Sequence, residues 1–332
     1  MKAIGYSSIG APSVLEKIEL PKPVPGPRDL LVKVEAISIN PVDTKIRRRA
    51  AALPGESWRV LGWDVAGVVE AVGAEVTLFA PGDEVFYAGE LMRQGGNAEW
   101  HCVDERLAGH KPETLDWGQA ASLPLTALTA WELLFERLGV TPETEGALLV
   151  IGGAGGVGSM LIQLARRLTE LTVIATASRA ESRAWCETMG AHHVIDHSRD
   201  MPAQLAEIGH PEIPFIASLT ASDVHHAFLV ETLAPQGVLA LIDDPVGFDI
   251  MPFKRKSATI AWEFMFTRSL FETDDKEIQG EILEEVARLV DEGLLRPTDT
   301  RRLAPICAET LREAHEASER GASIGKTVVL GF

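Results

Sequence analysis

The chain contains little cysteine and no long apolar run. Its three cysteines, Cys102, Cys186 and Cys307, are spread over 332 residues, and this wide spacing implies no disulfide framework. No apolar stretch approaches the roughly 20 residues that a membrane-spanning helix needs. The N-terminus also lacks the charged and then apolar pattern of a signal peptide. We therefore expect a reduced, cytoplasmic protein with no place in a membrane.

Positive charge is also scarce. The 31 Lys and Arg residues are outnumbered by 48 Asp and Glu residues, so the formal net charge is -17 at pH 7. Such a surface repels phosphate groups, which argues against nucleic acid or an acidic membrane as a partner. The remaining composition, with 46% hydrophobic and 24% charged residues, is typical of a globular protein. The length suggests two domains.

Glycine, by contrast, is concentrated in one segment. Residues 147–166, ALLVIGGAGGVGSMLIQLAR, begin as a buried strand, pass through five glycines within seven residues and continue at helical spacing. The pattern G-x-G-x-x-G lies between strand and helix, as a dinucleotide site requires. A tight turn, a bare backbone near a pyrophosphate and close strand–helix packing each exclude a Cβ atom, while the helix N-terminus faces the anion. The predicted cofactor-binding residues are Gly153, Ala154, Gly155, Gly156, Val157 and Gly158.

The pattern of predicted elements changes along the chain. Up to about residue 120, short β segments such as Leu30–Ile39 and Glu84–Tyr87 favour a mostly antiparallel, barrel-like fold. From residue 125, six predicted strands with helical crossovers indicate a doubly wound parallel sheet. Beyond Phe266, an acidic helix that ends at Gly293 precedes a strand, Lys326–Leu330, which we expect to rejoin the first domain. The six strands are predicted over 148–151, 171–175, 193–195, 215–219, 237–242 and 259–264, with helices over 180–189 and 224–233 among them.

Five segments give the chain a resemblance to the medium-chain dehydrogenase/reductase superfamily. They are INPVDTKIR (39–47), LGWDVAGVVEAVG (61–73), PGDEVF (81–86), SLPLTALTAWELL (122–134) and the glycine turn. Within the superfamily the chain is most similar to the zinc-independent quinone oxidoreductase branch, some of whose members carry a zinc-type alcohol dehydrogenase-like label. The resemblance implies an α/β fold, in which a GroES-like β-barrel catalytic domain (1–124 and 267–332) surrounds a Rossmann doubly wound parallel sheet (125–266). It also implies a homodimer built by joining the last Rossmann strands.

The zinc ligands of zinc-dependent relatives are replaced in this chain. The resemblance places Asn40 where those relatives have a cysteine, and Gly62-Trp63-Asp64 where they have Gly-His-Glu. Tryptophan has no lone pair to offer a metal, and an amide is a poor zinc ligand beside thiolate or imidazole. Cys102 with the histidines at 101 and 110 makes a poor substitute, because adjacent strand residues point to opposite faces. We therefore predict no metal, and we expect Asp64 to order its loop rather than to act as a base.

The predicted cofactor is NADPH. NAD-specific enzymes carry an Asp or Glu after the second Rossmann strand, where it binds the adenosine ribose 2′-hydroxyl. Here that position falls near Ala177 and holds no carboxylate, whereas Ser178 and Arg179 can donate to a 2′-phosphate. Ser178 also begins a Ser-x-x-Glu capping box, so it can cap the following helix instead. The two roles are compatible.

Polar residues at the ends of later elements are candidates for the nicotinamide end of the cofactor. Ser218 and Thr220 follow the fourth strand, and the resemblance implies that they approach the nicotinamide ribose; the alternative is a cap for the next helix. Thr126 lines the cleft near the nicotinamide by resemblance, and is otherwise a residue of a helix N-terminus. For Asp243 and Asp244, after the fifth strand, we favour a solvated turn.

The predicted chemistry is hydride transfer without a Lewis acid. A quinone or an α,β-unsaturated carbonyl is then the easier acceptor, because conjugation spreads the charge and hydrogen-bond donors suffice. Asn40 is the first candidate donor and Lys45 the second, although related quinone reductases often carry tyrosine where Lys45 stands. Asn40 can also be a turn residue before Pro41, and Lys45 heads a basic run, KIRRR, that can be a solvated or phosphate-facing surface. Trp63 is either an aromatic wall for a flat ring or a core tryptophan.

The sequence therefore predicts an NADPH-dependent oxidoreductase acting on a small quinone or enone. Two alternatives remain open. One is a zinc-type alcohol dehydrogenase acting on simple alcohols or ketones. The other is a non-catalytic, nucleotide-binding redox sensor.

Overall fold

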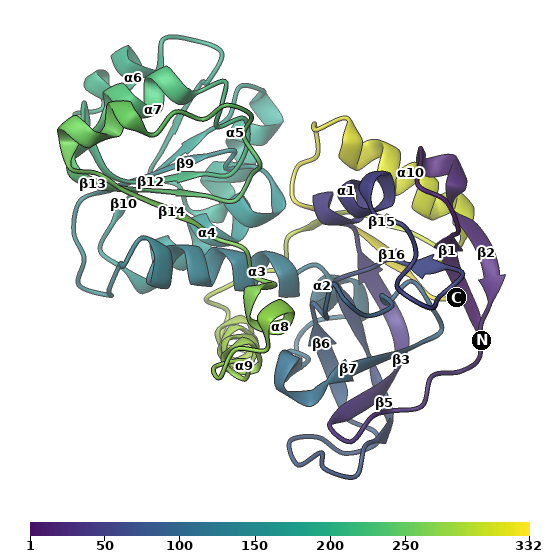
Figure 1. Cartoon of the computed structure of the whole chain (residues 1–332). Coiled ribbons are helices and arrows are strands. Elements are labelled where there is room, and N and C mark those ends of the chain that lie inside the picture. The colour runs from purple at the N-terminus through teal and green to yellow at the C-terminus, as the bar shows by residue number, and fades with distance from the viewer. The chain divides into compact units, whose positions relative to one another are not determined.

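The computed structural model describes all residues, 1–332, and divides them into two units. Unit 1 comprises Met1–Leu128 and Phe266–Phe332, and unit 2 comprises Thr129–Met265. Both ends of the chain therefore belong to unit 1, as Figure 1 shows. None of the helices combines the length and the hydrophobicity that a membrane crossing requires.

Unit 1 is built on two β-sheets. One has the strand order β2-β1-β4, and the other has the order β15-β16-β3-β5-β6-β8, with β7 paired to β3. All paired strands are antiparallel except β15 and β16, which confirms the predicted mostly antiparallel architecture. The strands are β1 (Lys2–Tyr6), β2 (Glu16–Glu19), β3 (Asp29–Ser38), β4 (Arg59–Val60), β5 (Val65–Val72), β6 (Glu84–Tyr87), β7 (Trp100–Asp104), β8 (Ala108–His110), β15 (Asp299–Leu303) and β16 (Lys326–Leu330).

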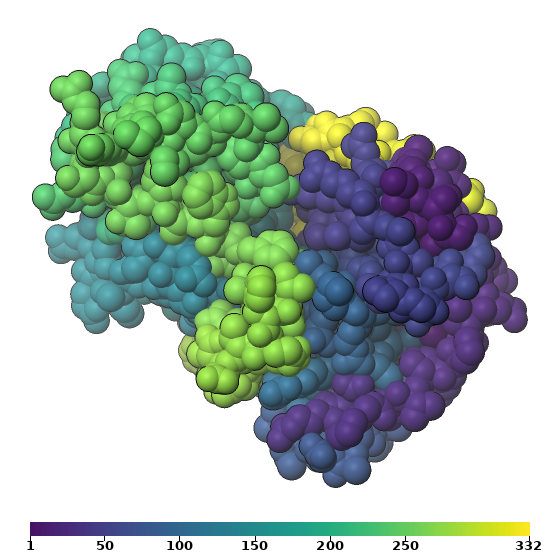
Figure 2. All heavy atoms as spheres, viewed as in Figure 1, coloured from purple at the N-terminus to yellow at the C-terminus, as the bar shows by residue number.

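The C-terminal strand joins the larger sheet beside β3. Val328 pairs with Ser38 and Leu330 with Ala36 in an antiparallel register, and the Ile39 N–H donates to the Thr327 carbonyl at 3.0 Å. This confirms that the last strand rejoins the first domain. In Figure 2 the yellow C-terminal residues accordingly lie against the purple N-terminal ones. The register brings Lys326, at the start of β16, to the segment that precedes the first helix.

The helices of unit 1 fill the connections between these strands. The predicted acidic helix before Gly293 is present as α9, and Gly293 adopts φ +74°, a left-handed conformation that glycine favours at a helix end. Helix α3 starts in unit 1 and passes into unit 2, where it continues as a π-helical turn over Glu132–Arg137. The helices are α1 (Pro41–Arg49), α2 (Trp117–Ala121), α3 (Pro124–Trp131), α8 (Thr267–Phe271), α9 (Ile278–Asp291) and α10 (Ala308–Glu319).

Unit 2 contains a six-stranded parallel sheet. Its strand order is β11-β10-β9-β12-β13-β14, and every neighbouring pair is parallel. The predicted doubly wound sheet is therefore confirmed. Its strands are β9 (Ala147–Ile151), β10 (Thr172–Thr176), β11 (His193–Ile195), β12 (Ile213–Ser218), β13 (Leu233–Leu241) and β14 (Thr259–Trp262), and its helices are α4 (Gly156–Leu168), α5 (Ala180–Met189), α6 (Met201–Glu207) and α7 (His226–Thr232).

The central strand of unit 2 is buried on both faces. Ala147, Leu149 and Ile151 pack in one hydrophobic cluster with residues of α6 and α7, and the alternate residues of β9 face the other way. Figure 1 shows α6 and α7 on one side of the sheet and α4 on the other. The carboxyl ends of the strands are where a nucleotide binds in such folds.

One predicted boundary in unit 2 is wrong. The sequence favours a strand from Gly237 to Ile242, but β13 already begins at Leu233. Pro235 and Gly237 resemble turn residues, yet both lie inside the strand, which is irregular. Gln236 adopts φ +62°, and the pairing with β12 shifts register at this point. An irregular strand of this kind has no period-two pattern to reveal it.

Candidate active site

The glycine turn connects β9 to α4 in unit 2. Gly152 has φ +83°, and a Cβ atom on Gly158 would lie 2.5 Å from the Gly152 carbonyl oxygen. A Cβ atom on Gly153 would lie 2.8 Å from the Cβ atom of Ala175 on the neighbouring strand. Helix α4 starts at Gly156 with Gly155 as its N-cap, so its first N–H groups have no acceptor inside the helix. The turn therefore has the close packing and the helix N-terminus that a pyrophosphate needs.

A pocket lies beyond the end of the neighbouring strand β10. Its volume is about 370 Å³, and it is lined by Ser178, Ala180, Arg183, Asp196, Arg199 and Gln204. Sequence reasoning singled out Ser178 but missed Arg183 and Arg199. Arg183 lies one helical turn after Arg179, a spacing that could have pointed to it. Arg199 follows a later strand, and nothing local in the sequence connects it to Ser178.

The lining of this pocket carries more positive than negative charge. The Arg183 guanidinium donates to the Val194 carbonyl at 2.8 Å, which fixes its stem beside the pocket. Arg199 pairs with the Asp196 carboxylate at 3.4 Å. Hydrogen bonds from Ser198 lower the pKa of Asp196, so this carboxylate is charged at neutral pH. Two arginines and one aspartate therefore line the pocket.

The N-cap of the helix after β10 lies one residue later than predicted. The N-cap of α5 is Arg179, whose N–H donates to Ser182 Oγ at 3.2 Å, and Ser182 Oγ donates back to the Arg179 carbonyl at 2.9 Å. The predicted Ser178-x-x-Glu181 capping box is therefore wrong, because Ser182 supplies the capping oxygen. The Ser178 side chain lines the pocket instead.

A chain of hydrogen bonds connects the ends of β12 and β13. The hydroxyls of Ser218 and Ser222 lie 2.7 Å apart, and Ser222 donates to Asp243 through both its hydroxyl, at 2.7 Å, and its N–H, at 2.9 Å. The solvated-turn interpretation of Asp243 is therefore wrong, since this carboxylate fixes the loop after β12. Thr220 is exposed, and a Cβ atom on Gly152 would lie 2.9 Å from its methyl group. Contacts of Ser218 and Thr220 with a ribose stay a prediction.

Asn40 is the N-cap of α1 in unit 1 and is only 1% exposed. Its amide nitrogen Nδ2 donates to Asp64 Oδ2 at 2.7 Å, and its amide oxygen Oδ1 accepts from Lys326 Nζ. Its backbone N–H donates to Asp43 Oδ2 at 2.8 Å. We call Ser38, Asn40, Asp43, Asp64 and Lys326 the Asn40 cluster; all five are buried.

Asp64 is the acceptor at the centre of the Asn40 cluster. Its Oδ2 accepts from Ser38 Oγ at 2.7 Å as well as from Asn40 and from Lys326 Nζ at 2.9 Å. Its Oδ1 accepts from the Leu125 N–H at 2.8 Å. A carboxylate that accepts four hydrogen bonds in this way orders its surroundings rather than acting as a base, which is the role expected from the sequence.

Asp43 is a second buried carboxyl group in the cluster. Burial raises its pKa to about 7, although hydrogen bonds from the Asn40 and Gly62 N–H groups and the charge of Lys326 oppose the rise. The bond from Gly62 is 3.0 Å long, so Asp43 connects the start of α1 to the segment that carries Trp63 and Asp64. Its protonation changes near neutral pH, a property that the sequence alone does not reveal.

The Asn40 cluster does not fit a zinc ion. The Asn40 oxygen already accepts from an ammonium group, and that ammonium lies 2.9 Å from the Asp64 carboxylate. A metal ion placed there would meet the positive charge of Lys326 and would have an amide in place of a thiolate. Elsewhere in the chain, no group of three or more His, Cys, Asp or Glu side chains is arranged to hold a metal. His101, beside Cys102, is bonded to Tyr87 and Gln94 instead.

Trp63 is packed in the interior of unit 1. It is 1% exposed, its indole N–H donates to the Glu90 carbonyl at 3.0 Å, and its ring meets Phe266 edge-on at 6.3 Å. These contacts are those of a core tryptophan. A role as a wall for a substrate ring stays a prediction.

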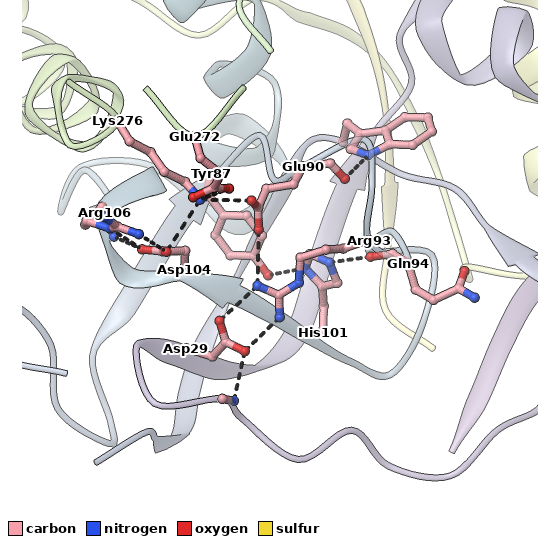
Figure 3. Close-up of polar contacts among 12 residues, drawn as sticks. Asp29, Tyr87, Glu90, Arg93, Gln94, His101, Asp104, Arg106, Glu272 and Lys276 are labelled. Carbon is pink, nitrogen blue, oxygen red and sulfur yellow. Dashed lines mark hydrogen bonds and ion pairs between the residues drawn. The ribbon is translucent and has the colours of Figure 1, made fainter. Parts of the chain in front are cut away.

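Glu90, which holds Trp63, belongs to a buried ionic network shown in Figure 3. The Glu90 carboxylate accepts from Arg93 at 3.1 Å and from Lys276 at 3.0 Å. Lys276 is 3% exposed and also faces the carboxylates of Glu272 and Asp104. Because its charges come from distant segments, sequence reasoning missed this network, which holds the loop carrying Glu90 in place.

A neutral pair lies beside this network. His101 Nε2 faces the Gln94 carbonyl at 2.8 Å, so Nε2 carries the proton and Nδ1 accepts from the Tyr87 hydroxyl at 3.0 Å. Burial lowers the pKa of His101 to about 4 and raises the pKa of Tyr87. Both side chains are therefore uncharged at neutral pH.

Lys45 and Thr126 occupy helices of unit 1. Lys45 lies on α1 and is partly buried. In the same basic run, Arg47 is 0% exposed, bonds the Gly10 carbonyl at 3.1 Å and pairs with Glu319, so the interpretation of the run as a solvated surface is wrong for this residue. Thr126 is buried and its hydroxyl donates to the Leu123 carbonyl at 3.0 Å. Roles of Lys45 and Thr126 in chemistry or cofactor binding stay predictions.

Comparison with known proteins agrees with this fold. Residues 26–123 match the alcohol dehydrogenase GroES-like domain, and residues 189–329 match the zinc-binding dehydrogenase domain. The chain is 40% identical to a zinc-type alcohol dehydrogenase-like protein of Staphylococcus aureus, over 99% of both chains. A solved structure from Rhizobium etli, of a candidate zinc-dependent alcohol dehydrogenase, superposes with a TM-score of 0.96 at 53% identity, covering 100% of this chain and 98% of the other.

A quinone oxidoreductase of Coxiella burnetii is also similar. Its structure has a TM-score of 0.83 at 28% identity and covers 100% of this chain and 99% of its own. The chain therefore belongs to the medium-chain dehydrogenase/reductase superfamily. It is an oxidoreductase of that superfamily, whose members act on small molecules. Its cytoplasmic location stays a prediction.

Proposed function

We propose that the chain is an NADPH-dependent oxidoreductase that transfers hydride to quinones or α,β-unsaturated carbonyls without a metal ion. The Asn40 cluster carries this proposal. An amide held between a carboxylate and an ammonium stands where zinc-dependent relatives have metal ligands, so hydrogen bonding takes the place of a Lewis acid. The similarity to a quinone oxidoreductase of Coxiella burnetii supports the same acceptor class.

The cofactor preference rests on the pocket beyond β10. Arg183 and Arg199 line it together with Ser178, and Arg179 is the N-cap of the adjoining helix. Guanidinium groups bind phosphate oxygens strongly, whereas a free ribose 2′-hydroxyl gains little from them. Asp196 opposes the phosphate but is outnumbered by the cations. In this proposal the pyrophosphate lies on the glycine turn and the 2′-phosphate in this pocket.

The acceptor preference follows from what Asn40 can donate. An amide nitrogen has two N–H groups, and one of them is used by Asp64. Bound NADPH supplies a hydride, and its addition to a conjugated acceptor leaves negative charge on the acceptor oxygen. In this proposal the second Asn40 N–H stabilises that charge. A simple ketone needs a stronger electrophile than one amide donor.

The test is an acceptor screen with protein dialysed against a chelator. NADPH oxidation is followed with quinones, enones and simple ketones. We expect turnover of quinones or enones that the chelator does not change. Turnover restricted to simple ketones and dependent on added zinc would establish an alcohol dehydrogenase instead. Tight NADPH binding with no oxidation by any acceptor would favour the redox sensor.

We also propose that the chain forms a homodimer through β14. This strand is an edge of the parallel sheet, paired only with β13, and its last residue, Trp262, is 50% exposed. An apolar edge strand is a ready template for pairing with a second copy. Trp262→Arg should convert a dimer to a monomer in sedimentation velocity experiments. A monomeric wild-type chain would contradict the proposal.

A further inference from the structure

Lys326 is a buried cation whose donors are all engaged. Its side chain is 4% exposed, and its ammonium donates to the Ile39 carbonyl at 3.0 Å, to Asp64 Oδ2 at 2.9 Å and to Asn40 Oδ1. An ammonium has three N–H donors and no acceptor. Lys326 therefore uses two of its three hydrogen bonds on the Asn40 amide oxygen and on Asp64, the carboxylate that accepts from the Asn40 amide nitrogen.

The two partners determine which way the Asn40 amide points. Lys326 can only donate, so it must face the amide oxygen, and a charged Asp64 can only accept, so it must face the amide nitrogen. The terminal torsion of asparagine is broad and roughly two-fold, so packing alone distinguishes the two orientations poorly. Without Lys326 the amide oxygen loses its donor, and only the bond from Asn40 Nδ2 to Asp64 still holds the orientation.

The same contacts polarise the amide. A cation on the oxygen withdraws electron density from the nitrogen and strengthens its remaining N–H as a donor, as linked hydrogen bonds do in a medium of low dielectric constant. The Asp64 carboxylate neutralises the ammonium, so a charged lysine can remain buried. Asp43 is the other titratable group that faces this site, through the backbone N–H of Asn40.

We propose that Lys326 is a positioning residue that acts on hydride transfer through Asn40. This inference rests on the proposed function, in which an Asn40 N–H binds the oxygen that becomes negative. Lys326 does not touch the substrate in this scheme. It keeps the donor aimed and polarised, and Asp64 serves as its counter-ion.

A merely structural role for Lys326 has to be separated from this one, because Lys326 also bonds the Ile39 carbonyl between β3 and α1. Lys111 offers a matched control. Its side chain is 6% exposed, pairs with Glu84 at 3.0 Å and donates to the carbonyls of Pro112 and Leu115. Lys111 thus has the same kinds of partners in the same unit but no bond to Asn40.

The experiment is a double-mutant cycle with NADPH and the best quinone of the screen. Asn40→Ala and Lys326→Met should each lower kcat by about 10²- to 10³-fold, the usual loss for one oxyanion donor. Their combination should lower kcat no further, because Lys326 has nothing to orient once the amide is gone. Lys111→Met should keep the wild-type kcat, and the KM for NADPH should not change in any variant.

Other results of the cycle would contradict the proposed function, the donor role of Asn40 or the positioning role of Lys326. If the wild type oxidises no NADPH with any acceptor, the proposed function fails and the inference fails with it. If the wild type is active but Asn40→Ala is as active, Asn40 is not the donor. If the two losses multiply, or Lys326→Met keeps the wild-type kcat, Lys326 does not act through Asn40. Should Lys326→Met not fold, Lys326→Gln replaces it in the cycle. It keeps a donor for Asn40 Oδ1 but loses the positive charge, so it should lower kcat less than Asn40→Ala does, and it should lower kcat no further when combined with Asn40→Ala.

Discussion

The glycine turn of unit 2 and the Asn40 cluster of unit 1 are both tightly packed, but they achieve this in opposite ways. The turn is close-packed because side chains are missing, so that backbone meets backbone around Gly152 and Gly158. The Asn40 cluster is close-packed around charges, with Asp64 and Lys326 at most 4% exposed. The stability of the glycine turn should therefore respond to added side-chain volume, and the stability of the Asn40 cluster to altered charge.

The largest effect is expected from Asp64→Asn. The change removes the counter-ion of Lys326 and leaves an ammonium buried without a carboxylate, which costs about 3–5 kcal/mol of unfolding free energy. Urea unfolding measures it. Asp43→Asn is the control, because Asp43 is equally buried but forms no ion pair with Lys326, and its loss should be clearly smaller. Equal losses of unfolding free energy in the two variants would mean that the ion pair with Lys326 makes no particular contribution to stability.

The next effect is expected from Gly158→Ala. The new Cβ atom would lie 2.5 Å from a backbone oxygen, which forces the turn to shift and costs about 1–3 kcal/mol as overpacking does, with loss of NADPH binding. Gly155→Ala is the matched control, since its Cβ atom would meet nothing closer than 3.5 Å. Gly155→Ala should fold like the wild type. Only its NADPH binding should be weaker, because Gly155 borders the predicted pyrophosphate. Thermal unfolding and fluorescence titration with NADPH separate the two, and identical behaviour would contradict the packing argument.

A smaller effect concerns the choice between NADPH and NADH. Arg183→Ala, Arg199→Ala and Arg179→Ala should each reduce the preference for NADPH by about tenfold, which corresponds to roughly 1.4 kcal/mol for one charge-assisted phosphate contact. Arg167→Ala, an exposed cation of α4 outside the pocket, should change nothing. The ratio of dissociation constants for the two nucleotides is the readout. An equal loss for NADPH and NADH would remove the arginine concerned from phosphate recognition.

The last effect is gradual, a pH dependence that arises in unit 1. The pKa of Asp43 is raised from 3.8 to about 7 in the folded protein, so between these values the folded state binds the proton that the unfolded state has released. Stability from this group is therefore present at low pH and is lost as the pH rises through 7, by up to about 1.4 kcal/mol per pH unit. Asp43→Asn has no carboxyl group to titrate. Its free energy of unfolding should therefore rise relative to that of the wild type as the pH rises. Urea unfolding at a series of pH values measures the difference, and parallel curves would contradict it.

The two regions also differ in how far the sequence predicts them. The glycine turn is contiguous and its demands are those of the backbone, so residues 147–166 predict its strand, its turn and its helix. The Asn40 cluster joins the end of β3, the start of α1, a residue before β5 and the first residue of β16. Asn40 and Asp64 could be selected from their own segments, but the bond to Lys326 depends on the register between β16 and β3. Arg199 of the β10 pocket was missed for the same reason, because its meeting with Ser178 depends on tertiary packing, whereas the spacing of Arg183 to Arg179 was a local signal.

The most direct test of the account is the rate of single-turnover NADPH oxidation by a quinone after exhaustive dialysis against a chelator. We predict that dialysis leaves the wild-type rate unchanged and that Asn40→Ala lowers it by about 10²- to 10³-fold. A rate that dialysis abolishes and zinc restores, with Asn40→Ala unaffected, would contradict the account.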